Sequence, residues 1–391
     1  MSEAVIIAPA RTAVGTARKG SLIHTRAEEL ALAAVNGVLE RSGIDPELVD
    51  DVMLAESLYG GGAVARHAAI EAGLTRAGGM ALNRHCAGSL TAVGLAAANV
   101  LCGMERAIIA GGVMSLSTGP QMRRRVLGTM EEFEERWQPP THPFHPEAPA
   151  TDMSITVGWN TARLTGLTRE EMDAWACRSH QRAIAAIDAG NFVEEIVPVQ
   201  ALQADGSRVE FKVDEHPRRD TTMEKLANLK VLHPEIEGFN ITAGNSSGTN
   251  DAAAAMLVTT GEFAAANGLA PKAKIRGWTA IGADPVRTGL AVIDVIEKLM
   301  SRTGRSAKDV VLWEINEAFA SVPIAASRHF GISEEIINIS GSGCSIGHPI
   351  AASGGRMLAT LINDLKRRGG GLGVAAMCAG GGQAGAMLIE V

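Results

Sequence analysis

The sequence predicts an α/β protein made of two similar halves, with a loop-rich segment inserted between them. Short apolar runs alternate with helical patterns over the first 115 or so residues, and the alternation returns from Lys272. Only 4% of the 391 residues are aromatic, whereas glycine is frequent at 44, which fits tightly packed α/β layers better than an all-β sandwich. Both outer thirds contain an apolar run that ends in glycines, Ile108-Ile109-Ala110-Gly111-Gly112 and Ala376-Met377-Cys378-Ala379-Gly380-Gly381. We therefore expect an internal duplication.

The first third is expected to alternate strands and helices. Residues 28–41 carry apolar side chains at helical spacing and stop before Gly43. Asp45-Pro46 predicts a second helix start, with Asp as N-cap and Pro at the first helical position. Residues 90–101 are apolar almost all round, which predicts a buried helix. Strands are expected at 5–8, 51–55 and 107–110.

Residues 116 to about 245 break this rhythm, because they are rich in proline, histidine and charge. One long helix is expected there, from the capping box of Thr168 and Glu171 to Gly190. We predict an inserted loop domain at 118–245, a first half formed by 1–117 plus 246–271, and a second half at 272–391. In the second half, strands are expected at 273–281, 310–315, 336–339, 373–378 and 385–390, and helices at 289–302, 317–329 and 350–367.

Bulk properties exclude several classes of protein. The net charge of −7 argues against nucleic-acid binding, which needs a basic face. Arg123-Arg124-Arg125 is either solvated surface or a patch for a phosphate-bearing ligand or a neighbouring subunit. Five cysteines without ligand spacing predict neither a disulfide framework nor a metal site, and free thiols suit the cytoplasm. No signal peptide and no apolar run of about 18 residues is found, so no membrane association is expected.

Cys86 is the first candidate for chemistry. It precedes the predicted buried helix, where the positive end of the helix dipole and unpaired N–H groups would favour the thiolate. We predict a nucleophile, the alternative being an inert buried cysteine.

His348, between Gly347 and Pro349, could exchange a proton with such a thiol; the alternative is a structural histidine. Cys378 ends an apolar run and opens a triple-glycine turn whose N–H groups could face an oxyanion. This second thiol could form a redox pair with Cys86 or act as a separate acid and base.

Asn316 follows a predicted strand, at the position where ligands usually bind in α/β sheets. It could orient a water or donate to an oxyanion, or it could cap the next helix. Cys102 and Cys177 lie in apolar helical stretches and suggest packing, whereas Cys344 is only four residues from His348.

Together these segments resemble the thiolase family, the acyl-CoA C-acyltransferases, over nearly the whole chain. The resemblance is carried by Gly244-Asn245-Ser246-Ser247-Gly248, Asn316-Glu317-Ala318-Phe319, Gly347-His348-Pro349-Ile350 and Cys378-Ala379-Gly380-Gly381-Gly382. It implies a thiolase-like fold of two βαβαβαββ halves, layered as α/β/α/β/α around shared buried helices, with the insertion covering coenzyme A.

The resemblance also implies roles for single residues. Cys86 matches the nucleophile that carries the acyl group, and His348 matches the base that activates it. Cys378 matches the acid and base that deprotonates the second thioester in condensation or protonates the acetyl-CoA leaving group in cleavage. One oxyanion hole of the family is matched by His348 and by Asn316, which would act through a water. The other is matched by the backbone N–H groups of Cys86 and Gly380. Coenzyme A contacts are implied for Ser247 at the pantetheine arm, Arg218 near the nucleotide, and Ala243, Phe319 and Met153.

The implied reaction is reversible, CoA-dependent cleavage of 3-oxoacyl-CoA to acetyl-CoA, or a related short acyl-CoA, and a shortened acyl-CoA, or the reverse Claisen condensation. It would run by a ping-pong route through an acyl-Cys86 thioester, as in fatty-acid β-oxidation. Coenzyme A would be a substrate, with no permanently bound cofactor, and the resemblance suggests a homodimer or homotetramer. The chain departs from the family at Ala87-Gly88-Ser89, at Val113-Met114-Ser115 and at Asp152, where short-chain members often have His.

Three other functions fit parts of the sequence. A ketoacyl-synthase-like condensing enzyme would need histidine where this chain has Cys378. A thiolase-fold protein that binds CoA with weak or lost turnover is supported by the altered stretch after Cys86. A nucleotide-dependent oxidoreductase is disfavoured, because Gly341-Ser342-Gly343-Cys344-Ser345-Ile346-Gly347 is one residue too long for the dinucleotide fingerprint.

Overall fold

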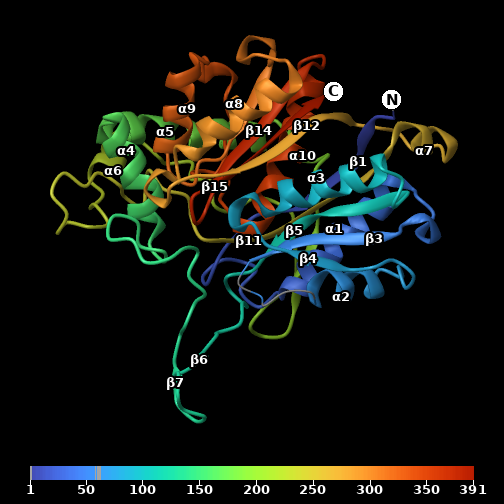
Figure 1. Cartoon of the computed structure of the whole chain (residues 1–391), viewed down its shortest axis with the longest axis horizontal. Helices are drawn as coiled ribbons and strands as arrows, with labels where there is room; N and C mark the ends of the chain where they lie inside the picture. Colours follow the sequence, from blue (N-terminus) through green and yellow to red (C-terminus); the bar gives the residue numbers. More distant parts are fainter. Residues whose placement is uncertain (1, 58, 60–62) are drawn as a thin grey trace.

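A single path of hydrogen-bonded strands runs through the molecule and joins its two halves. The computed structural model describes residues 2–57, 59 and 63–391 (Figure 1). The strand order is β13-β14-β15-β12-β1-β11-β5-β3-β4. The halves meet where Val5 and Ile6 of β1 pair with Lys274 and Ala273 of β12.

Each half contributes its own set of strands to this path. The first half supplies β1 (Ala4–Thr12), β3 (Asp51–Glu56), β4 (Met80–Leu82), β5 (Ala107–Met114) and β11 (Asn250–Thr260). The second half supplies β12 (Ala273–Gly282), β13 (Leu312–Ile315), β14 (Leu372–Ala379) and β15 (Gln383–Glu390). In both halves the first strand lies beside the last one, and the inner strands are parallel. This shared order agrees with the duplication that the glycine runs predicted.

Helices separate and cover the two sets of strands, so the layers are α/β/α/β/α as predicted. In the middle lie α3 (Gly88–Leu101) and α10 (Ser353–Arg367), which contact strands of both halves. The outer helices are α1 (Ala27–Ser42) and α2 (Ala63–Glu71) on one side, and α8 (Ala291–Thr303) and α9 (Ser321–Phe330) on the other (Figure 1).

Close packing in the middle layer depends on one glycine of α3. A Cβ added to Gly94 would lie 2.4 Å from the ring of Trp278 on β12. The absent side chain therefore lets the apolar helix approach the second half directly, as expected for a helix that is buried all round.

The inserted segment is irregular, with short elements. Its longest helix, α5 (Arg169–Asp188), begins at the predicted capping box, where the Thr168 side chain accepts from the N–H of Glu171. A hairpin of β6 (Arg124–Arg125) and β7 (Phe133–Glu134) projects away from the body (Figure 1). The other short elements are a π-helix (Ser154–Trp159), α4 (Asn160–Thr165), α6 (Met223–Ala227), β8 (Ile196–Val197), β9 (Val199–Leu202) and β10 (Arg208–Phe211). Outside the insertion, β2 (Gly15–Thr16) pairs with β11, and α7 (Gly261–Ala266) follows β11.

The strand predicted at 336–339 is wrong. Only Ile337 makes a bridge, to Trp313 of β13, and the preceding residues form a 3₁₀ turn, Glu334–Ile336. Asn338 has a left-handed φ of 51°, and its side chain bonds both the N–H and the C=O of Ile315 at 2.8 Å. A side-chain amide thus replaces the backbone pairing that a longer edge strand would have made.

Several helix boundaries also differ from the predictions. Asp45 caps only a 3₁₀ turn, Pro46–Leu48, not a full helix. The helix predicted at 317–329 begins at Ser321, and the one predicted at 350–367 begins at Ser353 after a 3₁₀ turn, Ile350–Ala352. The sequence patterns missed α2, β4, α7 and the long strand β11.

Candidate active site

The turn that carries Cys86 lies against the end of strand β14, which carries Cys378, and against the turn that follows His348. A 3₁₀ turn, His85–Ala87, contacts both β14 and the turn Ile350–Ala352 that follows His348. The N–H of Gly380, just beyond β14, donates to the Cys86 thiol. Cys378 is close enough that the Cys86 thiolate would oppose its ionisation. The folded chain therefore makes one site from residues that are almost 300 positions apart in sequence.

The turn at Cys86 is held in an unusual backbone conformation. His85 has a left-handed φ of 46°, and its N–H donates to Oδ1 of Asn83 at 2.8 Å. Non-glycine residues rarely adopt this conformation, and such strain is found preferentially at functional sites. Behind the turn, a Cβ on Gly88 would lie 2.6 Å from the side chain of Ala55, so this glycine lets α3 start directly against β3.

The prediction that the helix terminus favours the Cys86 thiolate is wrong in its net effect. Burial raises the pKa of Cys86 to about 11, although the N–H groups of Gly380 and Cys86 itself lower it in part. Burial also raises the pKa of Cys378, and the nearby Cys86 adds to this effect. Both thiols are therefore protonated at neutral pH, and Cys86 needs a base to become a nucleophile.

His348 is in the neutral protonation state that such a base needs. Burial, and secondarily the charge of Arg356, lowers its pKa to about 3, so the imidazole is neutral at pH 7. Its Nδ1 lies 2.6 Å from Oγ of Ser353, and its backbone N–H donates to Oδ1 of Asn250 at 2.9 Å. If Nδ1 carries the proton and donates to Ser353, Nε2 is left as the proton acceptor.

Asn316 lies beside this imidazole and does not cap a helix, because α9 begins only at Ser321. Its Nδ2 is 3.4 Å from Nδ1 and 3.5 Å from Nε2 of His348. Its Oδ1 is buried and has no hydrogen-bond partner among the residues that the structure describes. A buried amide oxygen of this kind calls for a water or a ligand atom as its donor. That Asn316 orients a water in the reaction stays a prediction.

Sequence reasoning missed a loop residue that closes over the glycine turn. A Cβ on Gly380 would lie 3.3 Å from Cγ2 of Thr141, and one on Gly381, where φ is 81°, would lie 2.6 Å from the Thr141 carbonyl oxygen. Thr141 is held in turn by His142, whose Nδ1 lies 2.8 Å from Thr141 Oγ1. The Pro- and His-rich composition of this stretch gave no signal for this contact, because only the fold brings the loop to the turn.

A pocket of about 440 Å³ leads towards this site from the inserted segment. It is lined by Ser246, Ser247, Gly248 and Thr249, with Arg218, Ala243 and Lys19 also on its wall. The backbone of Thr249 bridges that of His348, so this wall of the pocket is joined directly to the segment that carries the imidazole. Of the predicted coenzyme A contacts, Ser247, Arg218 and Ala243 line this space.

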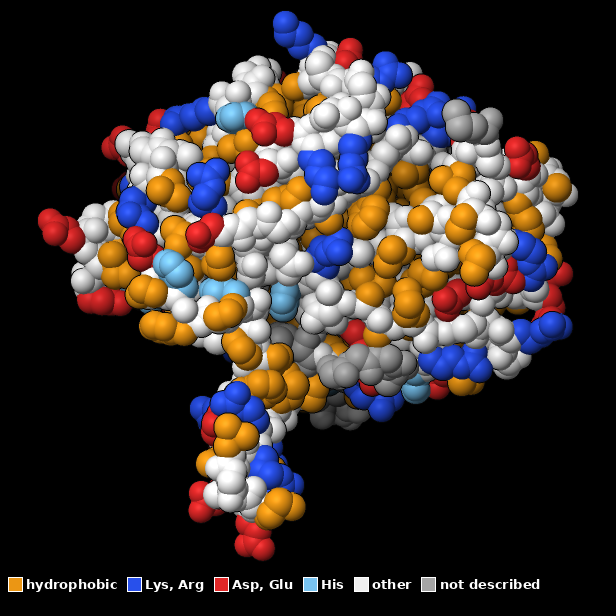
Figure 2. All heavy atoms as spheres, in the orientation of Figure 1, with side chains coloured by type: hydrophobic (Ala, Val, Ile, Leu, Met, Phe, Trp, Pro, Cys, Tyr) orange, Lys and Arg blue, Asp and Glu red, His pale blue; other side chains and the backbone are white. Residues whose placement is uncertain are grey.

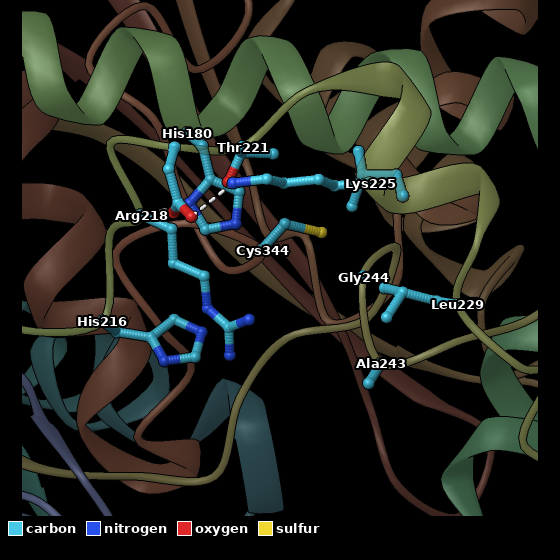
Figure 3. A pocket seen from close by; sticks show the side chains of 11 residues that line it. His180, His216, Arg218, Thr221, Lys225, Leu229, Ala243, Gly244 and Cys344 are labelled. Atoms are coloured by element: carbon cyan, nitrogen blue, oxygen red, sulfur yellow. Dashed lines mark hydrogen bonds and ion pairs between the residues drawn. The ribbon is translucent and has the colours of Figure 1, made fainter.

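A second pocket, of about 110 Å³, shares His216, Arg218 and Ala243 with the first. Figure 3 shows its cationic side chains, with Arg218 pointing toward the middle and Lys225 paired with Asp220 through an Nζ–Oδ2 distance of 2.6 Å. Cationic groups gathered around a cavity suit an anionic ligand such as a phosphate.

Phe319 and Met153, the other predicted coenzyme A contacts, do not line either of these two pockets. The ring of Phe319 lies against Gly158, where a Cβ would come within 2.7 Å of it, and Met153 packs against the core of the second half. Coenzyme A contacts at these two residues stay predictions.

The remaining cysteines are all free. Cys102 is exposed at the end of α3, Cys177 is buried in α5, and Cys344 is buried in the wall of the smaller pocket. Within the described residues, no cluster of three His, Cys, Asp or Glu side chains could hold a metal ion. In that same part of the chain, every helix is too short or too polar to cross a membrane.

Comparison with known proteins gives one consistent result. Residues 4–262 match the family model for the N-terminal domain of thiolase, and residues 269–391 match that for its C-terminal domain. An acetyl-CoA acetyltransferase of Pseudomonas aeruginosa is 38% identical over 98% of both chains, and a 3-ketoacyl-CoA thiolase of Bacillus subtilis is 34% identical over 100% of both. The crystal structure of an acetyl-CoA acetyltransferase from Bacillus anthracis superimposes with a TM-score of 0.89 at 33% identity, covering 100% of this chain and 99% of that one.

Proposed function

The chain belongs to the thiolase family of acyltransferases, and from this membership we propose how its site cleaves and forms 3-oxoacyl-CoA. The observation that carries the proposal is that Cys86 lies beside Cys378 and the Gly380 N–H, on a turn that contacts the turn following His348. Two thiols and one neutral imidazole supply the nucleophile and the proton carriers that a thiolase reaction needs.

In the cleavage direction, Nε2 of neutral His348 takes the proton of Cys86 as the sulfur attacks the 3-oxo carbon of the substrate. The bond between carbons 2 and 3 then breaks, and its electron pair forms the enolate of acetyl-CoA. Cys378 gives this enolate a proton and recovers one from the protonated His348, and acetyl-CoA leaves. The thiol of a second coenzyme A then loses its proton to His348, which is neutral again, and attacks the acyl-Cys86 thioester. His348 returns that proton to the departing Cys86 sulfur as the shortened acyl-CoA is released, so every group is back in its starting state.

The two sites for negative charge serve different steps. The Gly380 N–H already points at Cys86 Sγ, so it is placed for the oxyanion of an acyl group bonded to that sulfur. Two other donors then remain for the enolate oxygen of acetyl-CoA: His348, once its Nε2 carries the Cys86 proton, and a water that donates its other hydrogen to the unpartnered Oδ1 of Asn316. A water held by Asn316 would donate to that enolate oxygen.

We propose that the insertion, residues 118–245, covers coenzyme A between the halves 1–117 plus 246–271 and 272–391. The pocket of about 440 Å³ offers space for a pantetheine arm along Ser247, and its wall at Thr249 is bridged to His348. Arg218, shared with the smaller cationic pocket, is placed for the nucleotide phosphates. The proposed ligands are acyl-CoA and CoA, both as substrates.

The acyl group is the open part of the function. The relatives are named for acetyl, 3-ketoacyl and β-ketoadipyl substrates, the last being a thiolase of Pseudomonas aeruginosa at 36% identity over the full length of both chains. Asp152, where short-chain thiolases often have His, pairs with His233 at 2.9 Å. We propose that this pair changes the acyl end of the pocket, so that acetoacetyl-CoA is not the preferred substrate.

We propose a cytoplasmic homo-oligomer, a dimer or a tetramer. The free cysteines favour a reducing compartment. Leu127 and Met130 lie between the two strands of the projecting hairpin, and their exposed fractions are 97% and 77%. Figure 2 shows hydrophobic side chains among the charged ones on this arm. Apolar side chains on a protruding arm suit a contact with a second copy. A double Leu127→Glu, Met130→Glu variant should have a lower mass by light scattering, and an unchanged mass would remove the arm from the interface.

A panel of 3-oxoacyl-CoA substrates tests the function, with CoA-dependent loss of the 3-oxo thioester as the readout. Labelled acetyl-CoA should acylate the wild type at Cys86 but should give no thioester with Cys86→Ser. Loss of thioester substrate with the wild type and none with the variant is the expected result. Binding of CoA without turnover on any member would favour the alternative of a thiolase fold that has lost activity.

A further inference from the structure

A buried carboxylate beside Asn316 holds together three segments of the active site. The side chain of Glu317 is about 1% exposed and accepts four hydrogen bonds, two at each oxygen. The donors are Nε1 of Trp175 at 2.9 Å and Nδ2 of Asn338 at 2.8 Å on Oε1, and Oγ of Ser179 at 2.6 Å and the N–H of Cys344 at 3.1 Å on Oε2. No cation is among these partners.

The donors come from separate parts of the chain. Trp175 and Ser179 lie on α5 of the insertion, whereas Asn338 and Cys344 lie on the loop that leads to His348. The backbone of this loop is also close, since a Cβ on Gly343 would lie 2.5 Å from the carbonyl oxygen of Glu317. One side chain thus fixes α5, the loop and the end of β13 relative to one another.

The energetics explain why this arrangement is rigid. Burying an ionised carboxylate is costly unless its oxygens are hydrogen-bonded. Four donors satisfy Glu317, so moving any of the three segments would leave part of a buried charge without its partners. The folded state is therefore most stable in one relative arrangement of α5, the loop that leads to His348 and the end of β13.

Glu317 also lies between the proposed coenzyme A pocket and the reaction centre. On one side, Cys344 and His180, the neighbour of Ser179, line the smaller pocket (Figure 3). On the other side, the preceding residue, Asn316, reaches the imidazole of His348.

We propose that Glu317 is a positioning residue that keeps Asn316, and with it the water site at the Asn316 Oδ1, in the geometry of the enolate site. This inference rests on the proposed function, in which Asn316 serves the enolate and the Gly380 N–H serves the acyl group on Cys86. Displacing Glu317 therefore slows proton transfer at acetyl-CoA and carbon–carbon cleavage more than it slows acylation of Cys86.

Replacing Glu317 by Gln tests this inference with the smallest change of shape. The amide NH₂ of Gln would face two donors at either position. At the Oε1 position the two donors are the indole of Trp175 and the amide of Asn338. At the Oε2 position they are Ser179 and Cys344; the Ser179 hydroxyl can turn to accept, but the backbone N–H of Cys344 cannot. Two donors facing each other repel, so one of the segments has to shift.

The experiment compares two reactions of the same E317Q enzyme with saturating acetyl-CoA. Mass spectrometry follows acetylation of Cys86, and NMR in D₂O follows exchange of the acetyl-CoA α-protons. We expect exchange and thiolysis to fall by about 10- to 100-fold, the usual effect of losing an outer hydrogen-bond partner, and acetylation to change by less than about threefold.

The matched control is Glu195→Gln. Glu195 is also a fully buried carboxylate, bonded by Arg11, Thr360 and Asn363, but it lies away from Asn316. E195Q should lower the thermal stability without changing the ratio of α-proton exchange to acetylation.

The outcomes separate this inference from the function on which it rests. An equal fall of both reactions in E317Q, or no fall in either, would overturn the positioning role. A wild type that neither acetylates nor cleaves any substrate would overturn the proposed function instead. If E317Q does not fold, Trp175→Phe removes a single donor and should still lower exchange selectively, and the absence of a selective effect would equally reject the proposal.

Discussion

The Gly380→Ala substitution tests the proposed oxyanion site at its closest contact. The new Cβ would lie 3.3 Å from Cγ2 of Thr141 and 3.6 Å from the ring of His85, so only the first contact is too close. Relief of that contact needs a shift of a few tenths of an ångström, which moves the N–H now directed at Cys86. Complete loss of one oxyanion donor costs about 10²- to 10³-fold in rate, so a partial displacement should cost about tenfold.

The assay is the rate of acetyl-Cys86 formation from acetyl-CoA, measured in a double-mutant cycle with Thr141→Ser. Serine removes only the methyl group in the contact and keeps the hydroxyl that lies 2.8 Å from Nδ1 of His142. We expect T141S alone to be near wild type, G380A to be about tenfold slower, and the double variant to recover most of the rate. If the double variant stays as slow as G380A, the contact with Thr141 is not the cause and the reasoning is refuted.

Three further predictions concern stability and the imidazole. Burial lowers the pKa of His180 from 6.5 to about 4, so the unfolded state binds the extra proton and stability is lost as the pH falls from about 6.5 towards 4. His180→Asn keeps an acceptor near the position of Nδ1. Between pH 7 and pH 5, the free energy of unfolding measured with denaturant should fall by about 2 kcal/mol less in this variant than in the wild type, and equal falls would contradict the prediction. Gly94→Ala should destabilise the protein by about 1–3 kcal/mol despite the better helix propensity of alanine, because its Cβ meets the ring of Trp278, and a raised melting temperature would show that the helices can separate without cost. Ser353→Ala removes the partner at 2.6 Å from Nδ1 of His348 and should lower kcat about tenfold, whereas Ser353→Thr should retain more activity; equal rates in both variants would exclude this orienting role.

The strong local patterns of the sequence predicted most of the architecture. The apolar helix at 90–101, the capping box at Thr168 and the glycine-ended strands all have their counterparts in the structure. These features depend on neighbouring residues, which a sequence displays directly. The strand at 336–339 failed because the amide side chain of Asn338, through a contact across 23 positions, takes the place of backbone pairing.

The candidate site was predictable in its reactive residues but not in its protonation. Cysteine and histidine at glycine-rich junctions point to acyl transfer from their chemistry alone. The predicted direction of the pKa shift of Cys86 was wrong. The sequence shows a helix start, which would lower the pKa, but not the burial, which raises the pKa of the thiol to about 11. Thr141 was missed for a similar reason, since no local pattern links this loop to the glycine turn.

The sequence by itself therefore determined an α/β protein of two similar halves, because local periodicity displays it. Its short motifs determined the family, the layered fold that the family implies, and the types of side chain available for catalysis. The tertiary structure decided which of those side chains meet. It placed Cys86 and Cys378 together, left Oδ1 of Asn316 without a partner among the described residues, and surrounded Glu317 with four donors from two distant segments. The physical reason is that distances, burial and desolvation arise only when distant segments pack, and these quantities set both the pKa values and the geometry of the site.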